Sequence, residues 1–112
     1  DAMNIDLKGF REEYYQKLGG SLEAVKAFIV RASKDTHVEL TTLIVPGEND
    51  DVAEMEEEAA WIGSINREIP LHVTRFFPRY HMMDRQPTEV KKVYQLAQAA
   101  GKYLAHVFTG NC

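Results

Sequence analysis

The sequence predicts an α/β fold, a partial (β/α) barrel fragment with about four parallel strands and helices on the outer face. Four strand-like segments alternate with helical segments along the 112-residue chain, which indicates parallel pairing through right-handed crossovers. Each of the first three strand-like segments has an apolar face and a polar face, as expected where helices cover one side and a polar cavity lies on the other. A complete eight-stranded barrel takes about 250 residues, so this chain has the length of about half a barrel. The main alternative is a flavodoxin-like open sheet with helices on both faces, whose strands tend to be apolar throughout.

The first segment, residues 1–10, is expected to be a strand with different chemistry on its two faces. Because side chains alternate along a strand, one face carries Met3, Ile5 and Leu7, and the other carries Asn4, Asp6 and Lys8. A buried structural strand has little reason to carry a carboxylate, an amide and an ammonium group. Asp6 and Lys8 share a face and can reach one ligand, although they can also form a structural pair that satisfies only itself.

A short helical turn over residues 12–18 is expected to end at Gly19 and Gly20. Ser21 is the expected N-cap of the next helix, which extends to about Lys34. Apolar residues at helical spacing predict its buried side, namely Leu22, Val25, Phe28, Ile29 and Ala32.

The second strand is expected over residues 37–45, with Glu39 and Thr41 on its polar face. Asn49, Asp50 and Asp51 supply capping groups for a helix over residues 51–66. Its predicted apolar stripe consists of Val52, Met55, Ala59 and Ile62, widened by Trp61 and Ile65. The run of three glutamates at positions 56–58 is interpreted as a solvated helix face.

The third strand is expected over residues 71–76, with His72 and Thr74 on its polar face. A loop over residues 77–87 leads to a helix that starts at Pro87 or Thr88 and closes at Gly101. The buried side of this helix is predicted to carry Val90, Val93, Leu96, Ala97 and Ala100. The fourth strand is expected at about residues 104–109.

Composition narrows the classes of function. A net charge of −4 and a pI near 5.5 argue against a nucleic-acid-binding surface. No apolar run approaches the length of a membrane span, and no signal peptide is recognisable. Cys112 is the only cysteine, which excludes an internal disulfide and fits a cytoplasmic protein. The four histidines lack the spacing of metal ligands, so no metal site is predicted.

Three motifs in order resemble the second half of radical S-adenosylmethionine enzymes, and the nearest subgroup is that of the pyruvate formate-lyase-activating enzymes. The motifs are Asp6-Leu7-Lys8 (with Asp1 before it), Thr42 to Gly47 with Asn49-Asp50, and Arg75 to Pro78. More specifically, the chain resembles relatives found alongside AMMECR1 and Memo-like proteins. The resemblance implies a barrel of six β/α units when intact. It also implies a [4Fe–4S] cluster on a C-x3-C-x2-C loop, and reductive cleavage of S-adenosylmethionine to a 5′-deoxyadenosyl radical.

Carried over residue by residue, the resemblance assigns S-adenosylmethionine contacts to Asp6 and Lys8. Thr41 stands where activating enzymes carry an arginine, so a hydroxyl replaces a fixed charge. Phe77 stands where relatives often have a histidine near the adenosine, and it can stack but cannot hydrogen-bond. His81, four residues later, can compensate only if the loop folds back.

The cysteine triad of the family is missing, and the resemblance places it upstream of Asp1. Residues 1–112 are therefore expected to be the C-terminal part of the barrel, cut at both ends, inactive alone and without a cluster or bound cofactor of its own. The implied partner is a protein substrate, either a glycyl radical enzyme or an AMMECR1- or Memo-like protein. No binding to nucleic acid or to a membrane is expected. The alternative is a stand-alone β/α module that binds a small anion or another protein without catalysis. Bare strand edges predict self-association of the fragment.

Overall fold

The computed structural model describes residues 2–77 and 86–112, which form one four-stranded parallel sheet. The strands lie in the order β1-β2-β3-β4, so each strand pairs with its neighbours along the chain. Their bounds are β1 (Ala2–Asp6), β2 (His37–Ile44), β3 (Leu71–Arg75) and β4 (Val107–Gly110). Right-handed crossovers in this order place successive helices on the same face. The partial (β/α) barrel is thereby confirmed, and residues 2–77 and 86–112 do not form an open sheet with helices on both faces.

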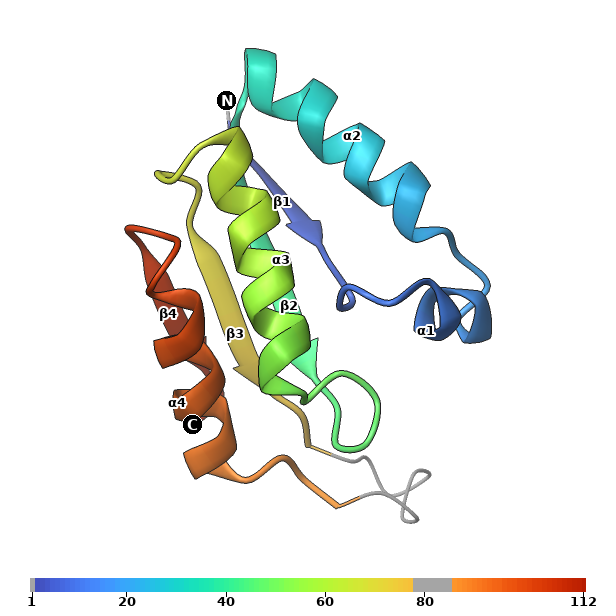
Figure 1. Ribbon diagram of the computed structural model, residues 1–112, viewed down its shortest axis with the longest axis vertical. Helices are drawn as coiled ribbons and strands as arrows, with labels where there is room; N and C mark the ends of the chain where they lie inside the picture. Colours follow the sequence, from blue (N-terminus) through green and yellow to red (C-terminus); the bar gives the residue numbers. More distant parts are fainter. Residues whose placement is uncertain (1, 78–85) are drawn as a thin grey trace.

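Within the described residues four helices connect the strands, and α3 and α4 lie against the same face of the sheet (Figure 1). Their bounds are α1 (Glu12–Lys17), α2 (Leu22–Asp35), α3 (Val52–Ile65) and α4 (Val90–Ala100). The predicted caps are confirmed, since the side chains of Ser21 and Asp51 accept hydrogen bonds from the first turns of α2 and α3. α4 begins at Val90 with Glu89 as its N-cap, so the prediction that this helix starts at Pro87 or Thr88 is wrong by two or three residues.

The hydrophobic core lies between the sheet and the helices. On β2, the side chains of Val38, Leu40, Thr42 and Ile44 are buried, and those between them are not. Leu40 lies between Ile5 of β1 and Leu71 of β3 in the register of the sheet. Burial of one such aliphatic side chain contributes about 1.5–3 kcal/mol, so this layer is the main source of stability.

Two predicted strand bounds are wrong. β1 ends at Asp6 rather than continuing to Phe10, because Gly9 has a φ of +110° and turns the chain away from the sheet. β4 begins at Val107, so Leu104 precedes the strand and packs in the core instead.

Two helical positions also differ from the prediction. Phe28 is half exposed, because α2 lies at the side of the sheet and its buried face is narrow (Figure 1). Glu58 is buried within the core, so the interpretation of positions 56–58 as a solvated face is wrong for this residue. It lies three residues after Met55 and four before Ile62, on the same stripe of α3.

Candidate functional site

One face of the sheet, called here the helix-free face because none of the described helices covers it, carries the polar side chains that the sequence predicts there. They are Asn4 and Asp6 on β1, Glu39 and Thr41 on β2, and His72 and Thr74 on β3. Each alternates with a neighbour on the helix-covered face, so they share one surface.

Asp6 and Lys8 lie together at the carboxyl end of β1. The Lys8 ammonium nitrogen is 3.9 Å from the Asp6 carboxylate, and the two side chains are 52% and 71% exposed. Asp6 pairs across the sheet with Thr41. An exposed pair at this distance adds little to stability, so both groups are available to a ligand.

A cleft of about 590 Å³ opens at the carboxyl ends of the first three strands. Asp6, Lys8 and Thr41 are among its polar lining residues, and Leu18 and Leu43 are among its apolar ones. Ligands of β/α barrels bind at this end of the strands, where loops converge. A mixed lining of this kind suits a molecule with a charged end and an apolar or aromatic part.

Thr41 lies in the cleft, but its hydroxyl already has an acceptor. It donates a hydrogen bond to the side-chain oxygen of Asn4 at 3.0 Å. To donate to a carboxylate in place of an arginine, the Thr41 hydroxyl has to leave Asn4. Its contribution to anion binding is therefore smaller than that of Lys8.

Phe77 lies beyond the end of β3 and does not line this cleft. Its ring is 53% exposed, and the Arg75 guanidinium carbon is 4.3 Å from the ring centroid. The neighbouring Phe76 lines the cleft instead and is almost fully buried. His81 and Pro78 lie outside the described residues.

Below the cleft, buried polar side chains hold the strand ends, and the sequence did not reveal this arrangement. Asn49 accepts from the Val45 amide at 2.7 Å and donates to the Leu43 carbonyl at 2.9 Å. The Tyr15 hydroxyl accepts from the Lys8 amide at 2.7 Å. Asn49 lies in the turn after β2 and Tyr15 on α1, and their partners are only four to seven positions away. Hydrophobic periodicity gives no signal for which backbone groups these side chains bond.

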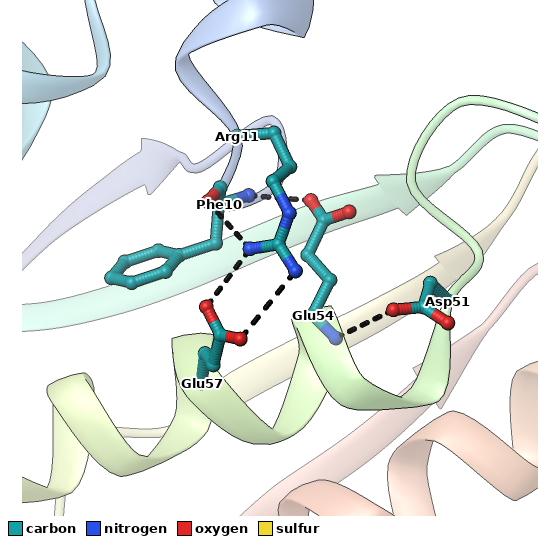
Figure 2. A network of polar contacts seen from close by, with 5 residues as sticks. All are labelled: Phe10, Arg11, Asp51, Glu54 and Glu57. Carbon is teal, nitrogen blue, oxygen red and sulfur yellow. Dashed lines mark hydrogen bonds and ion pairs between the residues drawn. The ribbon is translucent and has the colours of Figure 1, made fainter.

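Glu54 on α3 belongs to the same layer and binds the segment after β1 (Figure 2). Its carboxylate accepts from the Phe10 amide at 2.6 Å, and its own amide donates to Asp51 at 3.0 Å. Arg11 donates to Glu57 at 2.9 Å, and this contact raises the pKa of the guanidinium group. Burial raises the pKa of Glu54, against the opposing effect of the Phe10 amide.

Glu58 is the most strongly perturbed carboxyl group among the residues the structure describes. Complete burial raises its pKa to about 8, although the Thr42 hydroxyl, which donates to it at 2.7 Å, acts in the opposite direction. At neutral pH Glu58 therefore carries its proton. A neutral carboxyl group in the core avoids the large cost of a buried charge.

Three histidines lie toward the other end of the strands, each beside a carboxylate. Glu39 contacts His37 at 3.1 Å and His72 at 2.7 Å, and these contacts lower the pKa of Glu39. His106 contacts Glu68 at 2.9 Å. Over residues 2–77 and 86–112, no group of three or more His, Cys, Asp or Glu side chains is arranged to hold a metal ion.

Cys112 is exposed, and one thiol cannot replace the three thiolates that hold a [4Fe–4S] cluster. The residues of this chain therefore do not fit the cluster that the sequence resemblance implies. In the part of the chain that the structure describes, no helix is long and apolar enough to cross a membrane.

Comparisons with known proteins agree with the fold. Profiles of protein families give no match. An uncharacterized protein of Methanocaldococcus jannaschii is 35% identical over 114 residues, and the match covers 99% of this chain and 34% of that protein. The chain thus spans about a third of the length of this curated relative.

Among solved structures, the chain is similar to the crystal structure of a domain of pyruvate-formate lyase-activating enzyme from Bacteroides vulgatus. The TM-score is 0.85 with 18% sequence identity, and the match covers 98% of this chain and 67% of the other. At this identity the similarity concerns the arrangement of the backbone. The chain therefore shares the partial β/α barrel fold of a domain of a pyruvate-formate lyase-activating enzyme.

Proposed function

We propose that this chain is the C-terminal part of a radical S-adenosylmethionine enzyme and that its helix-free sheet face forms one wall of the S-adenosylmethionine site. The observation that carries the proposal is the position of Asp6 and Lys8, side by side in the cleft at the carboxyl end of β1. The fold shared with an activating-enzyme domain and the greater length of the archaeal relative support it.

The chemistry of the cleft suits the charged amino-acid end and the ribose of the ligand. The Lys8 ammonium can pair with the ligand carboxylate, and the Asp6 carboxylate can accept from the amino group or the ribose hydroxyls. The apolar lining residues Leu18 and Leu43 can contact the adenine ring. Asp6 and Lys8 would hold S-adenosylmethionine, and a cluster with its ligands in the rest of the protein would supply the electron for its cleavage to methionine and a 5′-deoxyadenosyl radical. The target would be a partner protein, either a glycyl radical enzyme or an AMMECR1- or Memo-like protein.

The first experiment concerns the protein encoded by the complete gene, purified without oxygen. We expect iron and sulfide in the ratio of a [4Fe–4S] cluster and a visible absorption band that bleaches on reduction. The absence of a cysteine triad from the remaining sequence, together with iron-free protein, would refute the proposal. S-adenosylmethionine binding without a cluster would instead favour a ligand-binding module without catalysis.

The second experiment tests the two residues directly in the same protein. Lys8→Ala and Asp6→Ala should each weaken S-adenosylmethionine binding about tenfold or more, because each removes a charge-assisted hydrogen bond worth about 1.5–3 kcal/mol. Their thermal midpoints should change little, since both side chains are exposed.

The matched control is Lys102→Ala, which removes an exposed lysine ion-paired with Glu56 at 3.0 Å. Binding should be unchanged in this variant. If the Asp6 and Lys8 variants lose stability and affinity in equal measure, the pair is structural and the assignment is wrong.

A further inference from the structure

The segment that follows β1 is held by side chains from two different helices. The last sheet-type bond runs from the Leu7 amide to the Thr41 carbonyl at 2.8 Å. The next amide, that of Lys8, donates to the Tyr15 hydroxyl of α1 at 2.7 Å. The amide of Phe10 donates to the Glu54 carboxylate of α3 at 2.6 Å. The backbone of Lys8 therefore stays fixed although it lies outside the strand.

Gly9 shows how closely this segment is packed. Its φ of +110° is a conformation that residues with a side chain rarely adopt. A Cβ atom at this position would lie 2.7 Å from a carboxylate oxygen of Glu54 and 3.1 Å from the Cβ of Asn49. The chain thus passes directly over α3 and over the loop after β2, and the room for movement is small.

Tyr15 is suited to fix this segment because the residue is itself immobile. Its side chain is 3% exposed and packs in the hydrophobic core. Its backbone carbonyl accepts from the Gly20 amide at 2.8 Å, which closes the end of α1. Burial raises the pKa of its hydroxyl, so the group stays neutral and serves as a fixed acceptor near neutral pH.

We propose that Tyr15 is a positioning residue, which holds the Lys8 backbone so that the ammonium group meets the anionic end of the ligand in the cleft. This inference rests on the proposed function, because the ligand is taken to be S-adenosylmethionine. A lysine has a long and flexible side chain, and its ordering on binding costs entropy. Because the backbone of Lys8 is already fixed, fewer conformations of the lysine remain to be restricted when the ligand binds, and the entropy cost of binding is smaller.

The test is a double-mutant cycle on the full-length protein, with S-adenosylmethionine as the probe. Tyr15→Phe keeps the buried ring and removes the acceptor of the Lys8 amide, and we expect binding about three- to tenfold weaker. In the Lys8→Ala background the same substitution should have almost no further effect, since the group it positions is gone. Hydrogen exchange of the peptide that contains Lys8 should be faster in Tyr15→Phe.

Two further variants separate positioning from general destabilisation. Tyr103→Phe removes a hydroxyl from a partly buried tyrosine beyond α4, and its binding should match the wild type. Gly9→Ala disturbs the same segment from the opposite side, and it should also weaken binding only when Lys8 is present. If either variant fails to fold, the other provides the measurement.

The outcomes distinguish this inference from the proposed function. If Lys8→Ala weakens binding but Tyr15→Phe and Gly9→Ala bind like the wild type, the inference is overturned and the proposed function stands. If the losses from Tyr15→Phe and Lys8→Ala multiply, Tyr15 acts through general structure and the inference is again overturned. If wild type and Lys8→Ala bind equally, the proposed function itself fails, and the positioning role falls with it.

Discussion

Glu58→Gln should change how the stability of this protein depends on pH. The wild-type carboxyl group is 1% exposed, and burial raises its pKa from 4.5 to about 8. Glutamine has nearly the same shape and retains an oxygen for the Thr42 hydroxyl, but it does not titrate. The substitution therefore isolates the proton equilibrium of one core residue.

The direction and size of the effect follow from linkage. Below pH 4.5, Glu58 is protonated in both the folded and the unfolded chain, so this residue does not make the free energy of unfolding depend on pH there. Between pH 4.5 and about 8, the unfolded chain ionises while the folded chain does not. The free energy of unfolding then falls by about 1.4 kcal/mol per pH unit and levels off above that range. Over the whole interval the loss approaches about 5 kcal/mol, a large part of the stability of a small domain.

The assay is urea-induced unfolding at pH 5, 6, 7 and 8, followed by the fluorescence of Trp61, the only tryptophan. The difference in unfolding free energy between Glu58→Gln and wild type should grow in favour of the variant by about 1.4 kcal/mol per pH unit. Groups that titrate in both proteins cancel in this difference. The absolute offset includes about 1–3 kcal/mol for the new amide donor, so the slope is the decisive quantity.

Glu57→Gln is the control, because it removes an exposed carboxylate from the adjacent position of the same helix. Its stability should run parallel to that of the wild type over this range, apart from the loss of an exposed pair with Arg11 worth at most about 1 kcal/mol. Parallel curves for Glu58→Gln and wild type would refute the buried, protonated state of Glu58.

Two further predictions concern packing and association. Thr88→Val should lower the free energy of unfolding in urea by about 2–3 kcal/mol, because the buried Thr88 hydroxyl donates to the Ile44 carbonyl and accepts from the Phe76 amide. A loss below about 0.5 kcal/mol, the size of a surface substitution, would contradict this. The 112-residue chain alone should self-associate at high concentration, because β1 and β4 are the two edge strands among the described residues and the helix-free face of the sheet is exposed. Light scattering that shows only monomer across the concentration range would contradict this prediction.

Periodicity in the sequence predicted the alternating strands and helices, favoured the partial barrel over the open sheet, and indicated the sheet face on which Asn4 and Asp6 lie. The alternation of Asn4, Asp6 and Lys8 with Met3, Ile5 and Leu7 requires only that the segment is extended, which holds up to the end of β1. The caps at Ser21 and Asp51 are local signals and were predictable for the same reason.

The layer beneath the cleft was not predictable in this way. Glutamate is a residue type expected at the surface, and the hydrogen-bond partner that allows Glu58 to be buried, Thr42, lies sixteen positions earlier on another element. The hydrogen bond between the Lys8 amide and the Tyr15 hydroxyl depends on the turn at Gly9, and the hydrophobic pattern of the sequence does not predict the direction of that turn. Phe28 was misplaced because helical spacing gives a direction on the helix but not the tilt of α2 against the sheet.

The consecutive order of the strands also bears on how the chain folds. Ala2 pairs with His37, Leu40 with Leu71 and Leu71 with Val107, so each pairing closes a loop of only about 31 to 36 positions. Each closure costs nearly the same entropy, because that cost grows slowly with loop length. Any neighbouring pair of strands with its intervening helix can thus nucleate, and the outer strands can then add one after another. β2 and β3 each belong to two of the three possible nuclei, whereas β1 and β4 each belong to only one. Changes in β2 or β3 should therefore slow folding, whereas changes in β1 or β4 should mainly speed unfolding.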